Sequence, residues 1–315
     1  MSTVQLSGRE LKRRERQKDW KANKVVYLLF IPVAVYFIIV HYLPMFGIVM
    51  AFEDFDLLKG VFGSKWVHFD NFIELFSGQA FPNALKNTII MALMNLTLGF
   101  AAPIVFALLI TSVENQKIRR VCQIITYLPN FVAAVVVTNL AKMFLGVDGP
   151  LTSLLTALGF ERQNWLANAS PPVFWLINNY IGVWTSFGFG SILFVAAISN
   201  ISGDLHEAAC IDGANRWQRM WKITIPNIMP MIIMMFTLQI ATSFKTGFDK
   251  ILLLYMPSTY NVADCLYTYT YRMAFGSAPD FGLSAASSLF QSVVGTILLF
   301  ASSALSRRIA GDSLV

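Results

Sequence analysis

His206 and Glu207 stand side by side, which is how the His-Glu-x-x-His pattern of many zinc proteases begins. That pattern needs a second histidine at the position that Cys210 occupies, and no third ligand is evident. The other histidines, His41 and His68, stand far from this pair in the sequence. No G-x-x-x-x-G-K-S/T phosphate-binding loop occurs in the chain. The sequence therefore predicts no catalytic residue, no metal site and no cofactor in this chain.

A different chemistry is indicated by polar and aromatic residues within long apolar runs. Gln239, Ser243 and Thr246 are spaced i, i+4 and i+7, so a helix would carry all three on one face. An upstream run adds three further candidates: Asn178, Trp184 and Phe187. Amides and hydroxyls beside aromatic rings suit a hydroxyl-rich ligand, which hydrogen-bonds and stacks at once. The alternative is packing, because small and polar residues also hold membrane helices together.

These candidates lie in runs long enough to cross a bilayer. The chain is 56% hydrophobic and 13% charged, with a mean hydropathy of +0.57, which excludes an ordinary soluble protein. About 20 apolar residues cross the ~30 Å hydrocarbon core. Six such runs are present: Val25–Ala51, Ala84–Val113, Val121–Leu145, Val173–Asn200, Ile223–Phe244 and Leu283–Leu305. The predicted fold is an all-α membrane protein with six transmembrane helices.

The positive charges are distributed unevenly along the chain. Of 24 lysines and arginines, 16 lie in the amino tail, in 114–120, in 203–222 and in the carboxyl tail. Positive loops stay in the cytosol, so both termini are predicted to be cytosolic. The predicted organisation is a basic tail (1–24), a six-helix transmembrane domain (25–305) and a second tail (306–315). A membrane anchor explains the basic amino tail better than nucleic-acid binding, so the predicted contact is the lipid bilayer.

The segment 207–230 reads EAACIDGANRWQRMWKITIPNIMP and predicts a short helix, a turn and a second helix. Asp204 is a candidate N-cap, with Glu207 three residues later in the spacing of a capping box. Gly213 supplies the permissive backbone that ends the first helix or lets another surface come close. A polar helix–turn–helix between two apolar spans suits a docking surface rather than a catalytic pocket.

This segment resembles the EAA loop of the membrane permeases of ATP-binding-cassette (ABC) importers. The motif is Glu-Ala-Ala, three residues, Gly, nine residues, Ile, one residue and Leu-Pro. Six positions are in register, with Ile225 replacing the usual leucine: Glu207, Ala208, Ala209, Gly213, Ile223 and Pro226. Asp212 and Ala214 favour the carbohydrate-uptake family, and the stretch 255–272 resembles its polysaccharide and complex-oligosaccharide branch. The resemblance extends over roughly residues 20 to 310.

The resemblance implies a type I importer permease, multi-pass in the bacterial cytoplasmic (inner) membrane. It implies that the EAA loop, here residues 203–226, couples to an ABC ATPase dimer, and that this partner holds ATP and Mg. The coupling residues would be Glu207, Ala208, Ala209, Asp212, Gly213 and Ala214. Further implied partners are a second homologous permease, an extracytoplasmic solute-binding protein and a carbohydrate substrate, either an oligosaccharide or a polysaccharide fragment. The implied mechanism is alternating access.

The predicted outer loops are rich in aromatic residues. Residues 52–83 combine acidic side chains with aromatic ones spaced like a short interfacial helix, which suits a lid or a docking surface for an external partner. Five tyrosines crowd the last outer loop, 247–280: Tyr255, Tyr260, Tyr267, Tyr269 and Tyr271. They suit contact with a sugar or a binding protein, and an aromatic belt at the membrane interface is the alternative.

Three other functions were weighed against a sugar importer. An ion-driven transporter would need a relay of ionisable groups in the membrane, and Lys142 and Lys245 lie at the outer ends of spans. A permease for a peptide or phosphate fits the Asp-Gly-Ala triplet and the aromatic outer loop less well. A non-transporting scaffold is disfavoured by the intact EAA register.

Overall fold

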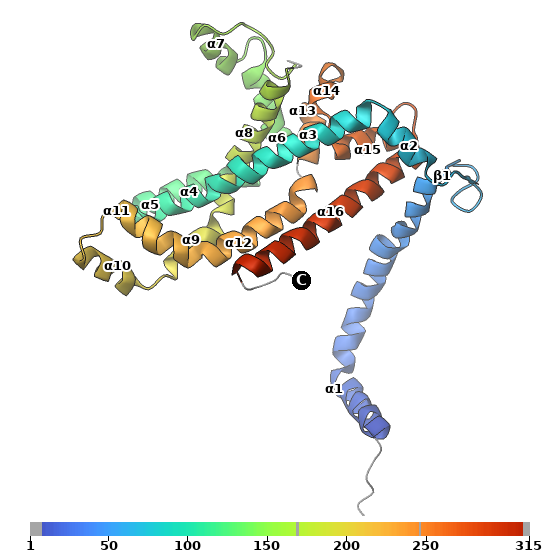
Figure 1. Cartoon of the computed structure of the whole chain (residues 1–315), viewed down its shortest axis with the longest axis horizontal. Coiled ribbons are helices and arrows are strands. Elements are labelled where there is room, and N and C mark those ends of the chain that lie inside the picture. The colour runs from blue at the N-terminus through green and yellow to red at the C-terminus, as the bar shows by residue number, and fades with distance from the viewer. Residues whose placement is uncertain (1–7, 168–169, 246, 311–315) are drawn as a thin grey trace, which may run out of the picture.

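The computed structural model describes residues 8–167, 170–245 and 247–310, which are almost entirely helical (Figure 1). The first half contains α1 (Gly8–Phe37), η1 (Ile38–Tyr42), η2 (Leu43–Phe52), β1 (Glu53–Asp54), β2 (Lys65–Trp66), α2 (Asp70–Ser77), α3 (Ala80–Met94), η3 (Asn95–Gly99), α4 (Phe100–Thr111), α5 (Gln116–Tyr127), η4 (Leu128–Phe131), α6 (Ala134–Leu145) and α7 (Pro150–Ala157). The second half contains α8 (Pro171–Gly190), α9 (Ile192–Ser199), α10 (Gly203–Ile211), α11 (Arg216–Arg219), η5 (Met220–Thr224), α12 (Ile225–Thr242), η6 (Ser243–Lys245), α13 (Phe248–Leu254), η7 (Pro257–Thr259), α14 (Tyr260–Ala263), α15 (Leu266–Phe275) and α16 (Phe281–Ala310).

Six helical segments of the described chain are long and apolar enough to cross a membrane: Ala22–Phe52, Ala80–Thr111, Ala134–Ala157, Pro172–Ser199, Arg216–Thr242 and Phe281–Ala304. The predicted number of spans is thereby confirmed. The expected continuous third span, Val121–Leu145, is instead interrupted between α5 and α6. Pro129 lies in this interruption, and its missing N–H prevents a regular helix from continuing through the turn.

The first span stands apart from the other helices. In Figure 1, α1 points away from the bundle that α3, α4, α8, α12 and α16 form. The most apolar stretch of Ala22–Phe52 has none of its residues buried. The chain joins the bundle only at η2, where Ala51 is fully buried. The first span therefore presents apolar side chains that nothing in this chain covers.

The fourth span consists of α8 and α9, and a glycine sets its distance from α5. A Cβ atom built on Gly188 would lie 2.1 Å from the carbonyl oxygen of Thr126 in α5. No side chain fits there without separating the two helices. The hydroxyl of Ser191 donates to the Gly188 carbonyl at 2.6 Å, where α8 ends and α9 begins.

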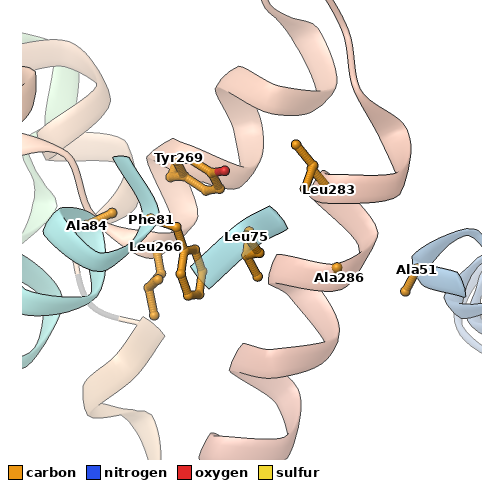
Figure 2. Packing of buried hydrophobic residues seen from close by; sticks show 8 residues of the cluster. All are labelled: Ala51, Leu75, Phe81, Ala84, Leu266, Tyr269, Leu283 and Ala286. Carbon is orange, nitrogen blue, oxygen red and sulfur yellow. The ribbon is translucent and has the colours of Figure 1, made fainter. Parts of the chain in front are cut away.

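Short helices, rather than an open loop, cover one end of the bundle. Residues 52–83 form the β1–β2 hairpin and α2, with Glu53 opposite Trp66, and residues 247–280 form α13, α14 and α15. Figure 2 shows one buried cluster that joins α2 and α15 to the long helices α3 and α16. Its members are Ala51, Leu75, Phe81, Ala84, Leu266, Tyr269, Leu283 and Ala286. Burial of these apolar surfaces, at roughly 25 cal/mol per Å², holds the outer helices on the spans.

Buried polar bonds fix the positions of α14 and α15. The Asn87 amide of α3 donates to the backbone oxygens of Asn261 and Asp264, at 3.1 and 3.0 Å. The backbone N–H of Leu266 donates to the Thr88 hydroxyl at 2.9 Å. Arg272 forms an ion pair with Asp264 at 2.5 Å, and only 4% of the Asp264 side chain is exposed. These bonds set the position of residues 264–266 against the middle of α3.

Candidate functional site

The EAA loop projects from one end of the bundle as a helix–turn–helix. In Figure 1, α10 and α11 lie at the opposite end of the molecule from α2 and α15. The Ser202 hydroxyl accepts from the Asp204 N–H at 3.3 Å, so Ser202 caps α10, rather than the expected Asp204. Asn215 and Gln218 form a capping box, with both bonds at 2.8 Å, and open the second helix. That helix continues through η5 into α12, so the loop is directly connected to the fifth span.

The surface of α10 is open. Glu207, Ala208 and Asp212 are exposed, and the side chain of Glu207 makes no hydrogen bond or ion pair with another residue of the described chain. Gly213 has a φ of +75°, and a Cβ atom there would meet nothing within 4 Å. Ala209 and Ala214 are partly buried, and the Ala214 N–H donates to the Ala209 carbonyl at 2.9 Å. The six predicted coupling residues thus lie together on one helix and its turn, accessible to another protein.

An ion pair links the EAA loop to the segment that follows the second span. Arg216 of α11 contacts Glu114 at 2.6 Å, beside a pocket of about 280 Å³ that Ser112, His206 and Arg219 help to line. The side chains of Arg216 and Glu114 are 68% and 83% exposed, so the pair contributes at most about 1 kcal/mol to stability. The contact between the loop and the segment after α4 is therefore a weak one.

A second site, which we name the polar cavity, lies among α3, α8 and the outer helices. Its volume is about 280 Å³. The lining residues are Thr88, Met91, Ala92, Asn95, Asn178, Asn179, Gly182, Thr185, Ser186, Ser243, Gly247, Lys250 and Cys265. Seven of the thirteen lining residues carry a hydroxyl or an amide side chain, and none of the described lining residues is a carboxylate. Such a lining suits a hydroxyl-rich ligand, which accepts and donates hydrogen bonds around its whole rim.

Two of the six predicted substrate residues meet in the polar cavity. Asn178 is 7% exposed, donates to the Met91 sulfur at 3.4 Å and leaves its Oδ1 without a partner in the described chain. Ser243 is 4% exposed, and its hydroxyl donates to the Ile240 carbonyl at 2.7 Å. Gln239 is not part of the lining. Gln239 and Ser243 are four residues apart at the end of α12, which ends at Thr242, and a short 3-10 helix begins at Ser243.

The remaining three candidates lie elsewhere. Trp184 faces a largely apolar groove of about 620 Å³ between α6, α7 and α8, together with Tyr180. Phe187 packs edge-on against Phe106 of α4, with ring centroids 5.3 Å apart. Trp184 and Phe187 of α8 therefore do not line the cavity to which Asn178 and Asn179 of the same helix contribute. Thr246 lies outside the described residues.

Lys250 is a site residue that the sequence analysis missed. It extends from α13 into the polar cavity, where its Nζ lies 2.6 Å from the place of a Cβ on Gly182. Burial lowers the pKa of Lys250 below its ordinary value. The sequence signal was a single lysine before the apolar run ILLL, at 251–254, which was assigned to an outer loop.

The outer tyrosines pack against the protein itself. Tyr269 is 5% exposed, and the Arg272 guanidinium lies 4.6 Å from the centre of the Tyr260 ring. Tyr255 and Tyr260 have centroids 4.9 Å apart. This environment favours a packing role for Tyr255, Tyr260 and Tyr269. Within the described ranges, no three His, Cys, Asp or Glu side chains are grouped so that they could hold a metal ion.

Comparisons with known proteins agree over most of the chain. Residues 103–311 match the family described as binding-protein-dependent transport system inner membrane component. Protein LplB of Bacillus subtilis is 35% identical over 93% of this chain and 92% of its own length. The polygalacturonan/rhamnogalacturonan transport system permease protein YteP of the same organism is 34% identical, over 93% and 90%. A chain of the bacterial ABC transporter involved in the import of the acidic polysaccharide alginate superposes with a TM-score of 0.86 at 34% identity, over 94% of this chain and 99% of that one.

Proposed function

This chain belongs to the family of binding-protein-dependent transport system inner membrane components, and we propose on that premise that it is the permease of an importer for oligosaccharides or polysaccharide fragments. It is a multi-pass protein of the bacterial inner membrane and a translocation subunit rather than an enzyme. The observation that carries the substrate proposal is the polar cavity, with its hydroxyl and amide lining between the spans. The relatives named for saccharides support it.

The ATPase partner docks on the EAA loop. Exposed Glu207 and the open, left-handed Gly213 support this, because a groove on a partner can close over α10 without meeting a side chain at its end. ATP and Mg belong to that partner. When the ATPase dimer closes, α10 moves with it, and the continuous helix from Arg216 to Thr242 transmits the movement to the fifth span. The cavity then alternates between the two sides of the membrane.

A second, homologous permease covers the first span. The most apolar stretch of the first span has no buried residue, which leaves more exposed apolar surface than a folded protein usually has. Contact with a second permease and with lipid accounts for this surface. Predicted cytosolic termini agree with this arrangement, since they place the EAA loop and the basic amino tail on the ATPase side.

An extracytoplasmic solute-binding protein docks at the end opposite the EAA loop. A solved relative is an alginate ABC transporter in complex with an alginate pentasaccharide-bound periplasmic protein, which supports such a partner. A pocket of about 400 Å³ at this end is lined by five carboxylates: Glu53, Asp54, Asp70, Glu74 and Asp280. Glu53 is 5% exposed, and its Oε2 has no partner within the described chain. Basic side chains of a docked protein would complement this charge.

Co-purification from native membranes tests the proposed function. We expect an ATPase and a second permease to be identified by mass spectrometry. The purified complex should hydrolyse ATP faster when an oligosaccharide and its binding protein are added. Recovery of this chain alone, without nucleotide-dependent activity in a folded preparation, would refute the importer function.

A further inference from the structure

Lys250 is the feature of the polar cavity that transport of a neutral sugar leaves unexplained. It is partly buried, and its Nζ makes neither a hydrogen bond nor an ion pair with any residue of the described ranges. An ammonium group withdrawn from water without a partner is unfavourable, so such a group normally has an opposite charge nearby. None of the described residues that line the cavity is an aspartate or a glutamate.

The geometry around Lys250 leaves the ammonium available to a ligand. Its Nζ lies against the bare backbone of Gly182, where a side chain would collide with it. The unpartnered Oδ1 of Asn178, four residues earlier on α8, lines the same cavity. One positive group and one free amide acceptor therefore stand beside hydroxyls from Thr88, Thr185 and Ser186. A sugar that bears a carboxylate offers the matching set: an anion for Lys250 and a hydroxyl donor for Asn178.

We propose that the saccharide carried by this permease is acidic, and that Lys250 binds the carboxylate of one sugar residue in the polar cavity. The proposal rests on the proposed function and names its substrate class. The cavity volume of about 280 Å³ is near the lower limit of small-ligand pockets, so it takes part of an oligosaccharide rather than a whole one. Burial raises the pKa of Cys265, the other titratable group among the described lining residues, which keeps its thiol uncharged, and Lys250 is the one charged group of that described lining.

Transport of a matched pair of substrates tests this role. The probes are a uronic-acid trisaccharide and the same trisaccharide with its carboxyl groups reduced to alcohols. Uptake is measured in proteoliposomes that hold the complete complex, with saturating solute-binding protein. Each variant is supplied with the same binding protein. A difference between variants in the ratio of acidic to neutral trisaccharide uptake therefore reports on the permease alone.

We expect Lys250→Gln to lower uptake of the acidic trisaccharide at least about tenfold relative to the neutral one, since charge-assisted hydrogen bonds are the strong ones. Lys250→Arg should keep most of the acidic uptake, because it keeps the charge. Lys142→Gln removes an exposed lysine outside the cavity and should leave the ratio unchanged. Size-exclusion chromatography establishes that each variant is folded before its uptake is compared.

Three results would overturn the proposal. The first is an equal loss of uptake of both trisaccharides in Lys250→Gln that Lys250→Arg does not restore. The second is an unchanged uptake ratio in Lys250→Gln, and the third is a wild-type complex that imports only the neutral trisaccharide. In the last two cases the importer itself survives. A wild-type complex that imports no saccharide of either kind, despite substrate-independent ATP hydrolysis, would instead refute the proposed function.

Discussion

The EAA loop carries its functional residues on eight consecutive positions of one exposed helix and turn, whereas the polar cavity is assembled from segments that lie far apart in the sequence. Residues 207–214 are in contact with little else, and α10 projects from the bundle (Figure 1). The cavity takes side chains from α3, α8, η6, α13 and the start of α15. A surface that must dock and release a partner needs access, while a site that must select a ligand needs enclosure.

The two regions also differ in how their charges are held. Arg216 and Glu114 beside the EAA loop form an exposed pair, which contributes little to stability. Asp264 and Arg272 next to the cavity form a buried pair that also bonds Thr268. Removing one partner of the buried pair should therefore cost more stability than removing one partner of the exposed pair. This contrast predicts that damage to the loop affects coupling, and that damage to the cavity affects binding or folding.

Gly213→Val should have the largest effect. A β-branched residue at a φ of +75° is strained by about 1–3 kcal/mol and places bulk on the docking surface. We expect sugar-stimulated ATP hydrolysis to fall to the unstimulated rate, a loss of at least about tenfold, while the protein stays inserted. ATPase assays on the reconstituted complex measure this.

Gly159→Val is the matched control, since Gly159 has a φ of +95°, has open space around it and lies beyond α7. It imposes similar backbone strain far from the EAA loop, so stimulation should persist. If both variants lose stimulation, strain alone is sufficient and Gly213 has no special role in docking.

The EAA loop could be predicted because its information is local. The helix and the turn follow from consecutive residues, and the structure changes only the cap, from Asp204 to Ser202. The six spans could be predicted for a similar reason, since length and hydropathy decide them. Pro129 also indicates the interruption in the sequence, because a proline breaks a regular helix. The hydropathy of residues 121–145 by itself predicts one continuous span.

The polar cavity could be predicted only in part, because its lining depends on which face of each helix points inward. On α8 the lining residues Asn178, Gly182 and Thr185 follow helical spacing, and Trp184 falls on the face of Tyr180 instead. The aromatic and amide candidates could have been separated by this periodicity. Lys250 could not have been placed, since only the long-range bonds of Asn87 and Thr88 hold the outer helices over the cavity.

Arg272→Met should have the largest effect on stability. It leaves Asp264 buried without its cation, and loss of one partner of a buried pair costs about 3–5 kcal/mol. Arg216→Met, which breaks the exposed pair at the EAA loop, should change the free energy of unfolding by less than about 1 kcal/mol. Thermal unfolding of both variants in detergent makes the comparison, and equal losses would contradict the difference between the two regions.

The loss of folding stability caused by Arg272→Met should grow as the pH rises. Burial already raises the pKa of Asp264, and removal of the guanidinium raises it further. A carboxyl whose pKa is higher in the folded state contributes its full stability below the ordinary pKa and loses it as the pH rises through the raised value. Unfolding midpoints of the variant and the wild type should therefore converge toward low pH.

Binding of an acidic saccharide should weaken with rising pH in the wild type. The carboxylate needs the charged form of Lys250, whose pKa is lowered by burial, and Cys265 stays neutral because burial raises its pKa. Above the pKa of Lys250, the affinity should fall by up to about tenfold per pH unit. Lys250→Arg should give a flat profile over the same range, because a guanidinium stays charged throughout it. Transport assays of both proteins across this pH range measure the profiles. Parallel profiles would show that Lys250 does not bind the carboxylate of the saccharide.

The smallest effect separates two neighbours on the fifth span that the sequence placed on one face. Ser243 lines the polar cavity and Gln239 does not, although the two residues are four positions apart at the end of α12. Ser243→Ala removes one hydroxyl from the ligand surface, and a hydrogen bond worth about 1 kcal/mol corresponds to a loss of about fivefold in apparent affinity. Gln239→Ala should change the apparent affinity by less than about twofold.

The concentration dependence of uptake in proteoliposomes distinguishes the two variants, with sugar-stimulated ATP hydrolysis at saturation as the check that coupling is intact. If Gln239→Ala weakens uptake more than Ser243→Ala, the ligand must contact α12 at Gln239 rather than in the polar cavity. The binding site would then lie closer to the EAA loop than the cavity does.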